Sequence, residues 1–341
     1  MQAIALPEIT WRPLFRTTLV VAPFVLLSLV LNNPLWIDVA LVAICIQIAW
    51  ERTELAPLGV LLHGLAIAVG FLFLFLSLLF QPLFVLGCAL MSAATIRMAA
   101  EGSKLRTLGN FTFIPALYLA CEMTERLPRD LYWPTATAFL PYIAIAIIPT
   151  MVQSVVDHWH TKKADGLRHF MRHFMRLTKN DPFGDHVPYL EDMAAVILAV
   201  GTAAFLVEWG HLDHGQWVIW SAASVVTGDT ASSRLKLRDR TIGALAGVPL
   251  GILAGLAIPH SETTYGVVIL GVFLTLTAFR SYVVGFGVRC GLVSLAIMLA
   301  GQSVSVASER IVNVILGGVI GALFVLAAHL AAQHLKPARK I

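Results

Sequence analysis

Residues 59–80 read GVLLHGLAIAVGFLFLFLSLLF, a run of 22 residues without Asp, Glu, Lys or Arg. A helix needs about 20 such residues to cross the hydrocarbon core of a bilayer. Backbone groups in lipid must be satisfied within the protein, so spanning segments are helices or closed barrels. Barrel strands would alternate apolar and polar residues, and this run does not alternate. The run therefore predicts a transmembrane helix.

The rest of the 341-residue chain has the same character. It is 58% hydrophobic and only 13% charged, whereas soluble domains carry about 25% charged residues. So few charges cannot cover a water-soluble fold of this size. The fold class is therefore an all-α polytopic membrane protein with about twelve transmembrane helices. The apolar runs fall near 13–31, 34–50, 57–80, 83–100, 107–122, 133–155, 191–209, 215–229, 240–258, 263–279, 282–300 and 310–334.

Two of these runs, 34–50 and 215–229, are short for a span, and we expect them to be broken or buried against neighbours.

Lys and Arg gather in every second connection and in the polar stretch 156–190, while alternate connections hold mainly acids and His. The positive-inside rule then places both termini and the middle stretch in the cytoplasm. The formal charge of +4 is modest and the basic residues flank spans, so no nucleic-acid partner is expected.

The two halves of the chain resemble each other. Residues 32–47 (NNPLWIDVALVAICIQ) align with residues 214–229 (HGQWVIWSAASVVTGD). Residues 96–106 (IRMAAEGSKLR) align with residues 279–289 (FRSYVVGFGVR). We interpret this as two parallel six-helix repeats, 1–155 and 191–341, joined by a cytoplasmic basic connector at 156–190. Such repeats are related by a pseudo-twofold axis along the membrane normal. Chance similarity between hydrophobic sequences is the alternative.

Four arginines mark the candidate substrate site. Arg97 and Arg106 in the first half have the same spacing as Arg280 and Arg289 in the second. Brought together by a twofold axis, their guanidinium groups would form a positive vestibule at the inner face of the membrane. A guanidinium fork matches the geometry of a carboxylate, so the vestibule would bind organic anions. In the alternative interpretation, these arginines are ordinary anchors that reach lipid phosphates.

Three titratable residues are candidates for proton coupling. Asp38 and Asp229 lie near predicted span ends, and His63 lies one turn inside its span. An ionisable group at membrane depth is a functional candidate by default, and His titrates near physiological pH. Pairing between neighbouring end residues, such as Asp229 with Arg234, is the simpler explanation for the acids. For Asp38, no basic residue lies close on its predicted side.

Gly243, Gly247, Gly251 and Gly255 recur every fourth residue along one predicted helix. Small residues at this spacing allow another helix to approach closely, so we expect a packing role.

The connector contains LRHFMRHFMRL (167–177), which as a helix has one basic and one apolar face, typical of a helix on the inner membrane surface. Histidines in and beside this segment could in principle bind a metal ion: His158, His160, His169 and His173. No Cys or carboxylate set completes a metal site, so no metal is expected.

We find no nucleophile elbow, phosphate-binding loop or dinucleotide-binding glycine pattern, so neither an enzyme nor a cofactor is expected.

Trp217 opens a span, a Gly-Asp-Thr turn and basic residues follow, and then comes Arg240-Thr-Ile-Gly243-Ala-Leu-Ala-Gly247. This pattern, best over 215–255, resembles the fusaric acid resistance and aromatic acid exporter superfamily, with plant aluminium-activated malate channels as more distant relatives. The first half lacks the Arg-xx-Gly-xxx-Gly signature after residue 51, and the chain lacks the large cytoplasmic domains of bigger members.

The resemblance implies a secondary exporter of small organic or aromatic acids in the bacterial inner membrane. Exporters of this kind often work with a periplasmic membrane fusion protein, which becomes an expected partner beside the lipid bilayer and the anionic substrate. A homo-oligomer is left open. Two alternatives remain: a passive organic-anion channel, and a membrane scaffold that transports nothing.

Overall fold

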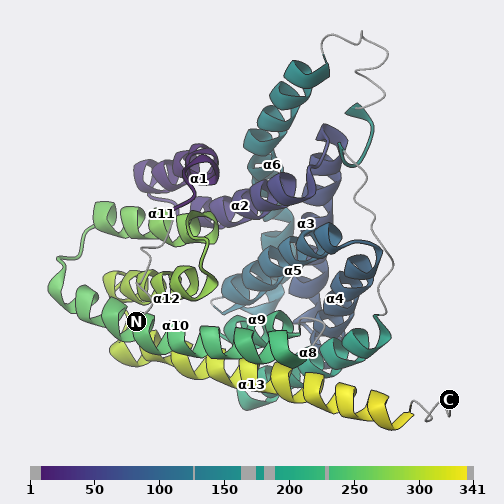
Figure 1. Ribbon diagram of the computed structural model, residues 1–341. Coiled ribbons are helices and arrows are strands. Elements are labelled where there is room, and N and C mark those ends of the chain that lie inside the picture. The colour runs from purple at the N-terminus through teal and green to yellow at the C-terminus, as the bar shows by residue number, and fades with distance from the viewer. Residues whose placement is uncertain (1–8, 126, 163–173, 180–188, 227–229, 336–341) are drawn as a thin grey trace, which may run out of the picture.

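The computed structural model describes residues 9–125, 127–162, 174–179, 189–226 and 230–335. These residues form twelve α-helices, one short 3-10 helix and two isolated β-bridges. Figure 1 shows how the helices are arranged. The helices are α1 (Trp11–Leu31), α2 (Leu35–Thr53), α3 (Pro57–Ser77), α4 (Gln81–Glu101), α5 (Ser103–Thr124), α6 (Tyr132–Lys162), α8 (Leu190–Gly210), α9 (Gln216–Val225), α10 (Thr230–Ala257), α11 (Glu262–Ala278), α12 (Tyr282–Leu299) and α13 (Val304–Leu335).

Eight of these helices are long and apolar enough to cross a membrane: α1, α3, α4, α6, α8, α10, α12 and α13. The helical membrane class is therefore confirmed. The sequence predicted about twelve spans, and four of the described helices fall outside that group of eight. Among them, α9 has only 10 residues and α11 only 17, while α2 includes Asp38, Glu51 and Arg52.

The two short runs noted in the sequence lie inside the bundle. Side chains of α2 from Val39 to Ala49 are almost fully buried apart from Leu41, and most of α9 is buried as well. Helices packed on all sides by protein need not be long or free of polar residues, because their neighbours replace lipid. The prediction that these runs are buried against neighbours is confirmed.

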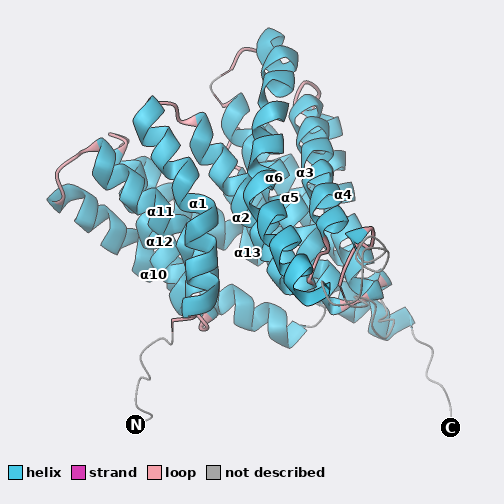
Figure 2. Ribbon diagram, turned by 90° about the horizontal axis from the view of Figure 1, so that it is seen from above, coloured by secondary structure: helices cyan, strands magenta, loops and turns pink. Residues whose placement is uncertain are grey.

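Contacts between the segments that connect the helices show which connections lie at the same end of the bundle. At one end Thr10 N–H donates to the Ala278 carbonyl at 3.0 Å and Lys104 pairs with Glu54 at 3.5 Å. At the other end His260 contacts the Met298 carbonyl at 3.0 Å. We call the first end the basic end, since it holds Arg97, Lys104, Arg234, Lys236, Arg238 and Arg280. The second is the acidic end, with Glu122, Glu125, Glu208, Asp213 and Glu262. Figure 2 shows the helices of the bundle side by side.

Corresponding helices pack in corresponding pairs in the two halves. In the first half α3 packs on α5 and α6, α4 packs on α5, and α2 packs on α6. In the second half α10 packs on α12 and α13, α11 packs on α12, and α9 packs on α13. Between the halves, α4 packs on α8 and α11 packs on α1. The match is incomplete, because α13 also packs on α8 without an equally extensive contact between α6 and α1.

Helices α10 and α12 pack very closely through glycines. An added methyl at Gly247 would come within 2.1 Å of the Gly287 carbonyl oxygen, and one at Gly251 within 2.0 Å of the Gly291 oxygen. Gly243 also faces Gly287, whereas Gly255 faces the Met298 side chain. Only a residue without Cβ permits such a backbone approach. The glycine stripe of α10 therefore fixes how side chains on α10 and α12 meet.

Candidate anion-binding site

Three guanidinium groups gather inside the second half of the bundle. They belong to Arg240 on α10, Arg289 on α12 and Arg310 on α13. Arg240 and Arg310 are only 4% and 6% exposed, and Arg289 is half-buried. Arg240 lies one turn before Gly243, and Arg289 follows Gly287 by two residues. The glycine contact between α10 and α12 thus brings these two arginines together. We call the three residues the guanidinium cluster.

Arg240 is held by neutral groups. Its Nε donates to Ser221 Oγ at 3.3 Å and its Nη1 to the Tyr282 hydroxyl at 3.2 Å. The guanidinium carbon lies 4.5 Å from the centre of the Phe286 ring. Ser221 in turn donates to the Val314 carbonyl at 2.6 Å, which links α9 with α13. These contacts orient the cation without neutralising it.

Arg289 and Arg310 are also surrounded by neutral groups. Arg289 donates from Nε to Thr275 Oγ1 at 3.0 Å and from Nη2 to the Thr275 carbonyl at 3.2 Å. Arg310 lies over the Trp217 ring at 4.8 Å and beside the Tyr118 hydroxyl. Its buried Nε has no hydrogen-bond partner. Tyr118 belongs to α5, so the first half also contributes to the cluster.

Among the residues that the structure describes, no carboxylate comes within 4.0 Å of these three guanidinium groups. Arg289 interacts electrostatically with both Arg240 and Arg310. Burying a charge without a counter-charge is costly, and nearby like charges add repulsion. An anion that enters the cluster would relieve both costs.

Further cations connect the cluster with the basic end. Lys236, one turn before Arg240 on α10, interacts electrostatically with Arg240 and with Arg106 on α5. Arg106 donates to the carbonyl of Val226, just after α9. Asp192 on α8 interacts electrostatically with Arg106. A line of basic side chains therefore leads from the basic end to the middle of the bundle.

The structure separates the four arginines predicted from the sequence. Arg289 is part of the cluster and Arg106 lies on its approach. Arg97 pairs with Glu101, packs over the Tyr189 ring at 5.1 Å and has 49% of its side chain exposed. Arg280 is exposed between α11 and α12. Whether Arg97 and Arg280 meet the substrate stays a prediction.

The proton-coupling candidates have different surroundings. His63 is 3% exposed on α3, and its ring nitrogens lie near the backbone of Leu108 and Phe111 without making a well-formed hydrogen bond. Asp38 lies in the first turn of α2, half-buried. Asp229, like residues 167–173 of the amphipathic connector segment, lies outside the described residues.

Sequence reasoning missed Arg310 and gave Arg240 no role beyond its motif. The available signal was an arginine at the start of the long apolar run 310–334 and another at the start of 240–258. Ionisable residues at membrane depth face the protein interior or a water-filled path. Neither arginine was considered as a binding residue in the sequence analysis, so their convergence was not predicted.

The segment that carries all three guanidinium groups also has a recognisable family pattern. Residues 202–324 match the family described as fusaric acid resistance protein-like. This confirms the resemblance drawn from residues 215–255. No curated protein and no solved structure matches the chain. The fusaric acid resistance protein-like segment runs from α8 into α13 and contains the complete cluster. Together with the apolar helices, the match indicates a membrane transporter-like protein.

Proposed function

We propose that this protein is a secondary exporter of small organic acids, aromatic acids among them, in the bacterial inner membrane. The observation that carries the proposal is the guanidinium cluster, three cations at the core of a membrane bundle with no carboxylate within salt-bridge distance among the described residues. A carboxylate substrate would supply the missing negative charge through charge-assisted hydrogen bonds. The Arg310 Nε, buried without a partner, is a donor available to it.

Aromatic side chains beside the cluster support aromatic acids as substrates. Trp217 lies under Arg310, Phe286 under Arg240, and the Tyr118 and Tyr282 hydroxyls adjoin the same two arginines. Aromatic rings gain from offset or edge-to-face contact with one another. A molecule with a carboxylate at one end and a ring at the other could use both kinds of contact.

The route proposed for the substrate runs from the basic end through the cluster to the acidic end. By the positive-inside rule the basic end, and with it both termini, faces the cytoplasm. Organic anions would gather at Arg106 and Lys236 and then move to the cluster. Because Arg240 and Arg310 are nearly inaccessible to water here, release requires another conformation.

Two parallel six-helix repeats, 1–155 and 191–341, provide a means for such a change. The equivalent packing of α3 on α5 and of α10 on α12 supports this arrangement, as do the equivalent contacts of α4 with α8 and of α11 with α1. In many transporters with repeats, the halves rock against each other around a central site. His63, Asp38 and Asp229 remain our candidates for coupling the motion to protons, and a periplasmic fusion protein is the proposed partner.

The test compares cluster variants with a matched surface variant. Arg240→Gln, Arg289→Gln and Arg310→Gln remove one cluster charge each, while Arg238→Gln removes a charge from the exposed face of the same helix α10. Losing a hydrogen bond to a charged group costs about 1.5–3 kcal/mol. This corresponds to roughly 10- to 150-fold weaker substrate binding. The assay is salicylate efflux from proteoliposomes, with protein amount and folding checked by size-exclusion chromatography.

We expect Arg238→Gln to retain efflux and the cluster variants to lose most of it. Normal efflux by all three folded cluster variants would refute the site. Anion currents measured across planar bilayers that do not change with an applied pH gradient would favour the passive channel instead. No flux of any acid by the wild-type protein would favour the scaffold.

A further inference from the structure

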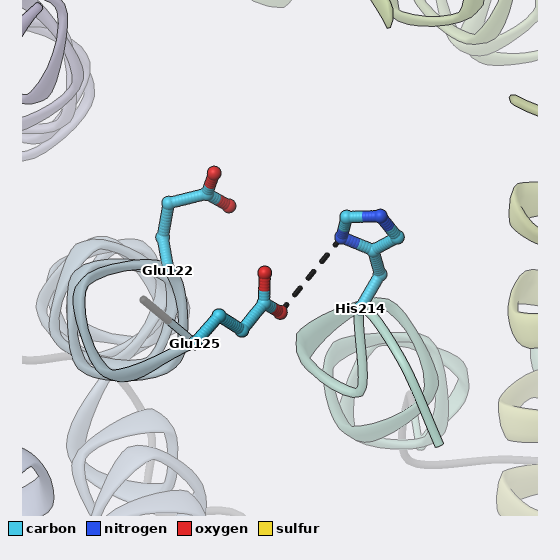
Figure 3. Close-up of side chains that lie close together, drawn as sticks. All are labelled: Glu122, Glu125 and His214. Atoms are coloured by element: carbon cyan, nitrogen blue, oxygen red, sulfur yellow. Dashed lines mark ion pairs between the residues drawn. The ribbon is translucent and has the colours of Figure 1, made fainter. Parts of the chain in front are cut away.

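A second group of polar side chains lies at the acidic end, apart from the guanidinium cluster. Glu122 and Glu125 come from the end of α5, and His214 comes from the connection between α8 and α9 (Figure 3). One ligand atom from each of the three lies within 4.8 Å of the others. His214 Nδ1 is 3.8 Å from Glu125 Oε1. The sequence predicted no metal site, and His214 stands 89 positions after Glu125 and 92 after Glu122.

Gln216 adds an independent observation. It is 1% exposed, and its Nε2 donates to Glu122 Oε2 at 3.4 Å, so its amide group lies against the Glu122 carboxylate. Its Oε1 is buried without a hydrogen-bond donor. His214 Nδ1, which faces Glu125, is also buried without a hydrogen bond. A buried oxygen acceptor without a donor is unfavourable, and a cation placed among these groups would satisfy it.

We propose that Glu122, Glu125, His214 and Gln216 form a binding site for a divalent transition-metal ion, with Zn²⁺ as the best-matched candidate. Zinc binds His nitrogen and carboxylate oxygen at about 2.0–2.2 Å. In the tetrahedral geometry of zinc, two such ligand atoms are roughly 3.3–3.6 Å apart. The observed limit of 4.8 Å means that small side-chain rotations bring the ligands into range. One imidazole with oxygen ligands favours such an ion over the all-oxygen sites of calcium and magnesium.

The site joins the two halves of the protein. Glu122 lies on α5 and Glu125 directly follows it in the first half, and the other two ligands flank the start of α9 in the second. The His214 ring stacks on Trp217 at 4.5 Å, and Trp217 also lies under Arg310. A bound ion would therefore fasten the halves at the acidic end, one aromatic residue away from the guanidinium cluster.

The experiment uses the full-length protein in detergent, freed of metal with a chelator and then titrated with Zn²⁺ by calorimetry. We expect one ion per chain. Glu125→Gln and His214→Asn should each weaken binding at least 10-fold, whereas Glu262→Gln removes a carboxylate from the same end outside the site and should not. His214 has a positive φ of 52°, and Asn tolerates that conformation better than other replacements.

Two further measurements keep the outcome clear. Zn²⁺ should raise the melting temperature of the wild-type protein but not of His214→Asn, because a ligand stabilises only a fold that binds it. Arg310→Gln should bind Zn²⁺ normally, which separates this site from the substrate site. Absence of stoichiometric binding, or equal binding by Glu125→Gln and Glu262→Gln, would overturn the proposal.

Discussion

The contact between α10 and α12 allows a quantitative prediction about stability. In Gly247→Ala the new methyl would lie 2.1 Å from the Gly287 carbonyl oxygen, whereas ordinary contact begins at 3.4 Å. The helices would have to separate by about 1.3 Å. Overpacking of this kind costs about 1–3 kcal/mol. Alanine also favours a helix over glycine by about 0.8–1 kcal/mol, so Gly247→Ala must be compared with a Gly→Ala change that meets no obstacle.

Gly201 on α8 provides that control. A methyl there would meet only the Ala89 methyl, at 3.9 Å. Both substitutions gain the same helix propensity, so the difference between them isolates the overpacking cost. We expect Gly247→Ala to be less stable than Gly201→Ala by about 1–3 kcal/mol in the free energy of unfolding. SDS titration of the protein in mixed micelles, followed by tryptophan fluorescence, measures this difference. Equal stability of the two variants would refute the glycine-mediated packing of α10 on α12.

Three other predictions concern single contacts. Ser261→Ala removes the N-cap of α11, whose side chain accepts from the Thr264 N–H at 3.0 Å, and should cost about 1 kcal/mol in the same unfolding assay; Ser261→Asn, which can still cap, should not. Lys104→Gln breaks an exposed pair with Glu54 and should change stability by less than about 1 kcal/mol, so a larger loss would mean that the pair is shielded from water. Trp217→Leu should reduce efflux of salicylate more than efflux of an aliphatic acid, and an equal reduction would argue against ring contact with the substrate.

Helix positions were largely predictable because their cause is local. The cost of placing polar groups in lipid acts on each segment separately, so each predicted apolar run overlaps one described helix. The glycine spacing on α10 likewise marks a close-packed face without reference to its partner. The number of spans was less predictable, because α2 and α9 are covered by protein and escape the requirements that lipid imposes.

The site was only partly predictable, because it depends on how helices are rotated and paired. Arg289 and Arg106 were singled out by their repeat spacing; Arg289 belongs to the cluster and Arg106 lies beside it. Arg240 and Arg310 were not, since a charge near a predicted helix end looks the same whether it faces lipid headgroups or the protein interior. The Glu122, Glu125 and His214 group gave no signal, because its members come from different halves of the chain.

The sequence by itself determined that this protein is a bundle of membrane helices with one basic and one acidic end. Those properties follow from transfer of each segment from water to lipid and from the charge of each connection. Only the tertiary structure decided which side chains meet. The glycine contact sets the rotation of α10 against α12, and that rotation turns Arg240 and Arg289 inward to join Arg310. Convergence of this kind is a property of long-range packing, which no local pattern encodes.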